Sequence, residues 1–209
     1  MRTLLVFLGL WMAAGRLVFA GDAGTGGIVV IDLVGVPSNI VKQVVSIVPG
    51  NLFCPVRVVQ FPQTFDGDMI KAVDTLEGLL SRQDVAIIAL ANVPGELAFR
   101  DIVASKRHVA ILNIAPLKPG KETPPEQADA VWATRVEKQI TAFVSYAAGM
   151  SPCPFPLCAR YMCATLAELD AKGRNACPPC QMAIEKLMHK KGTYLAPRGG
   201  MPLVFPEDK

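Results

Sequence analysis

The sequence predicts a single compact α/β domain, a mixed sheet flanked by helices, with a cysteine-rich segment at its C-terminal end. Stretches of β-branched residues alternate with stretches whose apolar residues recur at helical spacing, in the order strand–helix–strand–helix–strand–strand–helix. Hydrophobic residues make up 51% of the 209 residues and charged residues 19%, as in a packed globular protein. Five of the six cysteines lie between Cys153 and Cys180. We therefore expect one core and one segment with cysteine chemistry.

The first 20 residues have the features of a signal peptide. Arg2 gives a basic start, and the apolar run from Leu4 to Ala14 is too short for a permanent transmembrane helix. Residues 18–20 place small side chains at both recognition positions of a signal peptidase, so we expect cleavage there and export to the periplasm or out of the cell. The mature chain then has no stable membrane span. The alternative is an uncleaved anchor, but a glycine and an arginine at positions 15 and 16 interrupt the apolar run.

The expected domain, residues 28–191, begins with alternating strands and helices. After a lead-in at residues 21–27, the β-branched run at residues 28–36 is typical of a strand buried on both faces. A helix follows, with Ser38 as its expected N-cap. A second strand is expected at residues 55–62, where proline ends it.

The middle of the chain continues this alternation. The helix expected at residues 68–83 has one apolar stripe, and buried strands are expected at residues 84–93 and 108–116. Residues 118–127 contain three prolines and are expected to form a surface loop, followed by a helix at residues 132–149. The stripe of the first of these helices consists of Ile70, Val73, Leu76, Leu79 and Leu80.

The C-terminal part is expected to be helical around the cysteines. Thr165 and Glu168 have the spacing of a capping box, which predicts a short helix over residues 166–172. Another helix is expected from Cys180 to about residue 190, and residues 192–209 are expected to form an extended tail.

The cysteines form two closely spaced pairs that favour a metal site. Cys153 and Cys158 have C-x4-C spacing, and Cys177 and Cys180 have C-x2-C spacing about twenty residues later. Two such pairs can hold tetrahedral zinc, each pair through a tight turn. Four thiolates leave no open coordination position, so this pattern predicts one structural zinc ion.

Two alternatives for the same cysteines stay open. An exported protein meets oxidants, and Cys54 and Cys163 bring the count to six, which permits three disulfides. The Cys177–Cys180 pair also has the spacing of thiol–disulfide enzymes, although it lies late in the chain with a partner pair before it.

The cysteine segment resembles that of the archaemetzincins, zinc-dependent metallopeptidases of the metzincin type. Their signature HExxHxxGxxH runs directly into C-x4-C, a helix and a terminal C-x2-C that holds a structural zinc. The similar stretches here are CPFPLC and LAELDAKGRNACPPC, together with HVAILNIAPL and RVEKQI before them. The resemblance covers roughly residues 28–187 and implies a metzincin-like domain, with zinc bound by Cys153, Cys158, Cys177 and Cys180.

The resemblance fails where the catalytic zinc ligands should be. The HExxHxxGxxH frame falls on AFVSYAAGMSP, so Ala142 and Tyr146 replace the first two histidines, Phe143 replaces the glutamate base, and Pro152 replaces the third histidine. Only the glycine of the motif, Gly149, is retained. A catalytic zinc needs several imidazole or carboxylate ligands and a bound water, which these side chains do not provide. We therefore expect no catalytic residues at these positions.

Other residues do not restore the site. The two histidines, His108 and His189, lie outside this helix, and we expect them at the start of a strand and in the last turn of a helix. Arg160 stands where the family has a methionine after the second cysteine, and Met162 is expected to pack in the core. Cys163 is the alternative to Cys158 as a metal ligand if the register slips.

The favoured interpretation is an exported pseudopeptidase that binds a peptide or protein segment. Phe143 and Tyr146 either line the former substrate cleft or simply fill the core. The alternatives are an active zinc metallopeptidase with Asp, Glu or Cys ligands from elsewhere, and a disulfide-bonded exported protein with a redox or structural role. A net charge of +3 without a basic run argues against nucleic acid, and no feature indicates an oligomeric state.

Overall fold

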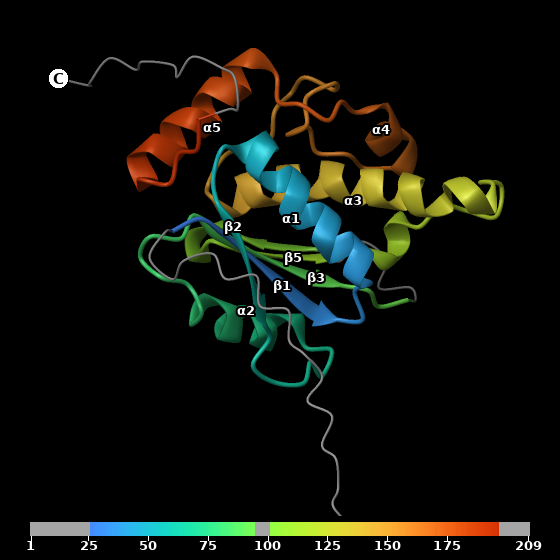
Figure 1. Cartoon of the computed structure of the whole chain (residues 1–209), viewed down its shortest axis with the longest axis horizontal. Coiled ribbons are helices and arrows are strands. Elements are labelled where there is room, and N and C mark those ends of the chain that lie inside the picture. Colours follow the sequence, from blue (N-terminus) through green and yellow to red (C-terminus); the bar gives the residue numbers. More distant parts are fainter. Residues whose placement is uncertain (1–25, 95–100, 197–209) are drawn as a thin grey trace, which may run out of the picture.

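The computed structural model describes residues 26–94 and 101–196, which form a five-stranded sheet with helices on both faces (Figure 1). The strand order is β2-β1-β3-β5-β4. The first four of these strands are parallel, and β4 runs antiparallel to β5 at one edge. The strands are β1 (Ile28–Val34), β2 (Val56–Gln60), β3 (Ala86–Ala91), β4 (Ile102–Ala104) and β5 (Val109–Asn113). The predicted mixed sheet is confirmed.

The helices are unequally divided between the two faces of the sheet. Helix α2 (Met69–Glu77) covers one face, whereas α1 (Ser38–Leu52) and α3 (Pro125–Ala147) pack on the other, with α4 (Leu166–Ala171) and α5 (Pro178–Lys191) beyond them (Figure 1). Side chains that alternate along each strand supply both cores. Val30, Ile88 and Leu112 face the layer of α1 and α3, and Ile31 and Ile87 face α2.

Strands β1, β3 and β5 have the burial expected for β-branched runs. Ile28 to Ile31 and all of β3 and β5 are buried, since helices cover both faces. Short 3-10 turns, η1 (Ser105–Arg107) and η2 (Ala115–Leu117), precede and follow β5. The buried Trp132 of α3 donates its Nε1–H to the carbonyl oxygen of Ile114 (2.9 Å), which fixes the start of α3 against the end of β5.

Several predicted element boundaries are wrong. Helix α3 begins at Pro125, inside the predicted loop, because proline is well tolerated at the first helical position. Helix α2 ends at Glu77, not at residue 83, and Ile70, the first residue of the predicted apolar stripe, is 74% exposed. Ser38 lies inside α1, whose N-cap is Pro37. The three-residue strand β4 was not predicted.

The C-terminal helices agree with the prediction. The hydroxyl of Thr165 accepts a hydrogen bond from the Glu168 N–H (3.2 Å), as in a capping box, while the Glu168 carboxylate accepts from the Ala164 N–H (2.7 Å). After α5 the chain packs back on the domain, because the Leu195 N–H donates to the carbonyl oxygen of Phe53 (2.7 Å).

The predicted signal peptide at residues 1–20 and most of the predicted tail lie outside the described residues. Within residues 26–94 and 101–196, no helix combines the length and apolar character needed to cross a bilayer.

Candidate metal centre

The first cysteine pair lies in the loop that follows α3. The Cys153 N–H donates to the carbonyl oxygen of Arg160, and the Cys158 N–H donates to that of Phe155, both at 3.0 Å. The residues between the two cysteines, 154–157, are exposed, whereas both cysteines are buried. The turn therefore presents its two thiols to the interior.

The second pair starts helix α5. Cys177 is its N-cap and Cys180 lies in its first turn, with prolines at the two positions between them. The partial positive charge at a helix N-terminus stabilises thiolates placed there. The sequence therefore puts this pair where a helix favours sulfur ligands.

A short backbone ladder holds the two pairs together. The Gly173 N–H donates to the carbonyl oxygen of Leu157, and the Ala159 N–H donates to that of Asn175, both at 3.0 Å. A Cβ atom on Gly173 would overlap with the Leu157 carbonyl oxygen, so only glycine permits this approach. The ladder brings segments on either side of α4 into contact beside the four thiols.

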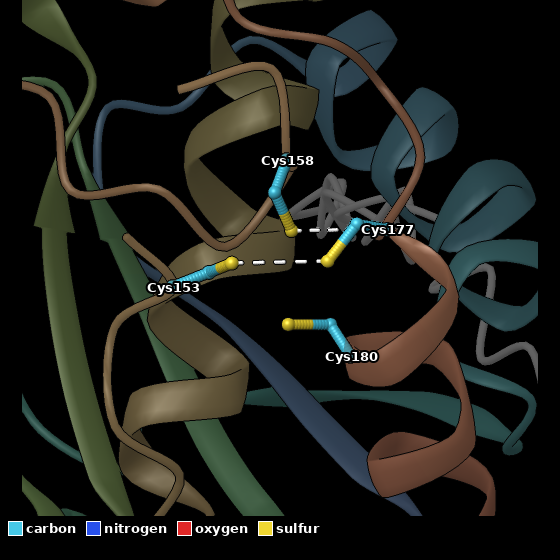
Figure 2. A group of neighbouring side chains, drawn as sticks. All are labelled: Cys153, Cys158, Cys177 and Cys180. Carbon is cyan, nitrogen blue, oxygen red and sulfur yellow. Dashed lines mark hydrogen bonds between the residues drawn. The ribbon is translucent and has the colours of Figure 1, made fainter. Parts of the chain in front are cut away.

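The four sulfur atoms form one compact group (Figure 2). The Sγ atoms of Cys153, Cys158, Cys177 and Cys180 all lie within 4.8 Å of one another, and those of Cys153 and Cys177 are 3.8 Å apart. A tetrahedral zinc ion with Zn–S bonds of about 2.3 Å separates its sulfurs by about 3.8 Å. The group can therefore hold zinc after small side-chain movements, and its thiols are soft ligands that suit this metal.

Hydrogen bonds and burial act differently on the individual thiols. Cys158 Sγ accepts from the backbone N–H groups of Cys177 (3.3 Å) and Arg160 (3.4 Å). Burial raises the pKa of the Cys158 thiol in spite of these bonds. Burial also raises the pKa of Cys180, to about 12, and the charge of Arg160 opposes that rise. The pKa of Cys177 is lowered, chiefly by a hydrogen bond from the Cys180 N–H. Without a metal, the buried thiols of Cys158 and Cys180 are therefore protonated at neutral pH.

The remaining two cysteines lie outside the four-sulfur group. Cys163 is half-buried, and its Sγ donates to the carbonyl oxygen of Tyr161 (3.9 Å). Cys54 is buried in the core, and burial raises the pKa of its thiol to about 12. All six cysteines are free thiols here, and Cys158, not Cys163, joins the other three.

Solved structures with a similar fold identify the architecture. A zinc-dependent peptidase from Methanocorpusculum labreanum superposes with a TM-score of 0.61 at 20% identity, covering 76% of this chain and 100% of that chain. An archaemetzincin from Methanopyrus kandleri superposes with a TM-score of 0.63 at 19% identity, covering 81% and 99%. The chain has an archaemetzincin-like fold. An archaemetzincin from Archaeoglobus fulgidus, in complex with malonate, gives 0.55 at 15% identity, covering 75% and 98%. No protein-family model matches the chain, and no curated protein matches its sequence.

The positions that the sequence frame predicts to replace the archaemetzincin catalytic residues lie in the last turns of α3 and just beyond it. Ala142 is 1% exposed and Tyr146 is 5% exposed, and the Tyr146 hydroxyl donates to the carbonyl oxygen of Arg160 (2.7 Å). Phe143 is half-buried with its ring centroid 6.0 Å from that of Tyr146, and Pro152 is exposed. Gly149 follows α3 with φ +89°, the left-handed conformation that favours glycine. Tyr146 therefore packs as a core residue, and Phe143 is partly accessible.

The two histidines lie outside the predicted catalytic positions. His108 caps η1 in a left-handed conformation, and its Nδ1 lies 3.1 Å from the carbonyl oxygen of Ala147 at the end of α3. His189 lies in the last turn of α5 and stacks on Tyr194, with centroids 3.9 Å apart. The prediction that Met162 packs in the core is wrong, because its side chain is 59% exposed.

Two buried cations near the thiols were not predicted from the sequence. Arg160 is 5% exposed and Lys172 is 2% exposed. One feature of the sequence distinguishes Arg160: it stands two residues after Cys158, where the archaemetzincins have a methionine. No feature of the sequence predicts that Lys172 is buried, because it lies at the end of α4, where lysine is ordinarily exposed.

Proposed function

We propose that this chain is an exported, non-catalytic protein with an archaemetzincin-like fold, which holds one structural zinc ion and binds a peptide or an extended protein segment. The observation that carries the proposal is the state of Ala142 and Tyr146. These positions are buried, one carries only a methyl group, and the other uses its hydroxyl in a hydrogen bond to Arg160. Neither offers a metal an imidazole or a carboxylate.

The environment of Tyr146 supports this view. Burial raises the pKa of its phenol well above the ordinary value of 10.0, so the hydroxyl stays neutral at physiological pH. A neutral, hydrogen-bonded phenol is a poor zinc ligand, and a single oxygen does not hold the ion without partners. Pro152, at the third ligand position, has no donor atom free to bind a metal.

The four-thiol group supports a structural ion. Its ligands come from a loop and from the start of α5, two segments otherwise joined by a short ladder. Zinc there cross-links them and leaves no position for a substrate. Thiolates must replace the protonated thiols of the metal-free protein, so binding releases protons and becomes stronger as the pH rises.

Edge strand β4 supports a peptide as ligand. It pairs with β5 on one side and is the last strand of the sheet in the described part of the chain. An edge strand offers unpaired N–H and C=O groups to an extended peptide. Helix α3 packs beside β4, and its Phe143 is partly accessible. A peptide added along β4 gains backbone hydrogen bonds from the strand, and the proposal assigns the apolar contact to this ring on the neighbouring helix.

Metal analysis and a hydrolysis assay test the proposal together. Purified mature protein is expected to contain one zinc ion per chain and to cleave no peptide. Two ions per chain, with hydrolysis stopped by a chelator at a concentration that leaves the fold intact, would refute it.

A matched pair of variants tests peptide binding. Phe143→Ala should weaken the binding of extended apolar peptides roughly tenfold, because an accessible aromatic contact contributes about 1–2 kcal/mol. Ile70→Ala is the control, since Ile70 is exposed on α2 across the sheet. Fluorescence anisotropy of labelled peptides measures both, and equal affinities in the two variants would exclude this binding face.

A further inference from the structure

Two cations are buried beside the four thiols without an acidic partner. Arg160 is 5% exposed and Lys172 is 2% exposed. Neither forms an ion pair with a carboxylate anywhere in residues 26–94 and 101–196, where the ion-paired lysines and arginines are more exposed than these two. Buried charges in proteins are normally paired or bound to a metal site, because isolation from water is costly. Another group therefore has to supply the negative charge that compensates these two cations.

Arg160 is built into the frame of the thiol group. Its N–H donates to Cys158 Sγ, and its carbonyl oxygen accepts from the Cys153 N–H. Its guanidinium donates through Nη2 to the carbonyl oxygen of Ser151, while the buried Nε–H has no hydrogen-bond partner in the described residues. The charge also acts on the Cys180 thiol. The guanidinium is thus only partly satisfied by neutral groups, while its backbone is bonded to the loop that carries Cys153 and Cys158.

Lys172 lies at the end of α4, and of the thiols that act on its charge Cys163 acts most strongly and Cys158 less. Its Nζ donates to the carbonyl oxygen of Tyr161 (3.2 Å), and burial lowers its pKa, while the thiols of Cys163 and Cys158 act in the opposite direction. Lys138 offers a contrast. It is also buried, but its Nζ donates to the carbonyl oxygens of Leu169 and Asp170, and the Asp170 carboxylate contributes a favourable charge.

A divalent ion with four thiolates supplies the missing charge. Zn²⁺ and four thiolates have a net charge of −2, and Arg160 and Lys172 together contribute +2. We propose that Arg160 and Lys172 are the counter-ions of a divalent metal held by Cys153, Cys158, Cys177 and Cys180, and that they stabilise the metal-loaded form selectively. This proposal rests on the zinc site of the proposed function.

The charge balance distinguishes the possible states of the cysteines. Two disulfides are neutral and would leave both buried cations uncompensated, as would four protonated thiols. A monovalent ion with four thiolates would carry −3 and a trivalent ion −1, so a divalent ion matches the two cations best. The surroundings of the thiols therefore favour zinc thiolate over disulfide.

Substitutions that remove each charge test the proposal. Arg160→Met and Lys172→Met are expected to weaken zinc binding by about tenfold or more, as loss of an outer-shell partner of a metal site does. Arg160→Lys keeps the charge and should retain more of the affinity. The matched control is Lys138→Met, which removes a buried lysine from the same region and should leave zinc affinity unchanged. Competition with a chromophoric chelator measures the affinities, and the spectrum of the cobalt-substituted protein reports whether the tetrahedral thiolate site has formed.

The stability of the two forms separates a counter-ion from a packing role. With zinc bound, Arg160→Met should unfold at a lower urea concentration than the wild type. Without zinc, it should be as stable as the wild type or more stable, because a buried uncompensated charge has been removed. Equal loss of stability in both forms, or unchanged zinc affinity in both Met variants, would overturn the inference. Wild-type protein that binds no zinc would instead overturn the metal site of the proposed function.

Discussion

Under the proposed function, removal of the zinc ion should destabilise the protein by at least the free energy of closing the cysteine loop. A zinc ion shared by the two cysteine pairs closes the loop from Cys153 to Cys180, which is 28 residues long. A cross-link that persists in the unfolded chain restricts a loop of this length by about 3.5 kcal/mol in the chain-entropy model, and tighter binding of zinc to the folded site adds to this amount. Without zinc, α5 still packs through Ile184 and Met188, which are buried. We therefore expect a folded but weakened domain.

The assay compares zinc-loaded and chelator-treated protein by thermal and urea unfolding. A loss of about 3.5 kcal/mol corresponds to a fall of about 7–14 °C in Tm for a domain of this size. Added zinc should restore the Tm. Magnesium should not, because it prefers oxygen ligands. Thiol titration of the unfolded, unreduced protein should find at least four free thiols, since all six are free in the structure.

Disulfides would reverse every part of this result. A disulfide-linked chain loses stability with a reductant and ignores the chelator. Two disulfides within the group leave only Cys54 and Cys163 as free thiols when the chain is unfolded without reduction, and three disulfides leave none. A Tm insensitive to both treatments would also refute the reasoning, because neither cross-link would then be present.

Three further predictions concern the fold and the former ligand positions. Burial raises the pKa of Asp101 to about 6 against a hydrogen bond from the Asn113 N–H, so the folded state binds this proton more tightly than the unfolded chain. Stability should therefore fall by about 2–3 kcal/mol as the pH rises from about 4 to above 6, and Asp101→Asn should remove this contribution, measured as the difference from wild type in urea unfolding at each pH. Leu76→Ala should cost about 2–5 kcal/mol in the same assay, because Leu76 is fully buried, and Ile70→Ala should change stability by under about 0.5 kcal/mol. Tyr146→Phe should cost only about 1 kcal/mol and leave the zinc content at one ion, because the carbonyl that accepts from its hydroxyl keeps a second donor, the Cys153 N–H.

The parts of the fold that the sequence predicts are those whose pattern is local and repeated. The β-branched run at residues 28–36 predicts β1, and apolar residues at helical spacing predict α1. Both patterns are visible because the buried residues recur at the spacing of a strand or of a helix. Strand β4 has only three residues, so no period is visible. The buried face of α2 consists of Ala72, Val73 and Leu76, with Met69 packed against the same core, and Ile70 lies off this face with its side chain exposed.

The candidate metal centre also has a part that the sequence predicts and a part that it does not. The spacing of the cysteine pairs predicts the group, since each pair is local and one tetrahedral ion joins them. The burial of Lys172 depends on how α4 packs against α3 and the cysteine loop, which no local pattern reports. The hydrogen bond from Tyr146 to Arg160 likewise joins residues that become neighbours only when the loop folds back on α3.

Under the proposed function, the end of α3 no longer needs a metal to hold it. In a metallopeptidase, histidines of this helix are fixed by the ion they bind. Here the Tyr146 hydroxyl bonds to the cysteine loop, and the imidazole of His108 lies against the carbonyl oxygen of Ala147, so neutral hydrogen bonds anchor the helix end. Arg160 takes part in this anchor through its carbonyl oxygen and lies beside the thiols through its guanidinium. Under this proposal, the zinc site and the end of α3 are therefore joined at Arg160, whose carbonyl oxygen accepts from both the Tyr146 hydroxyl and the Cys153 N–H.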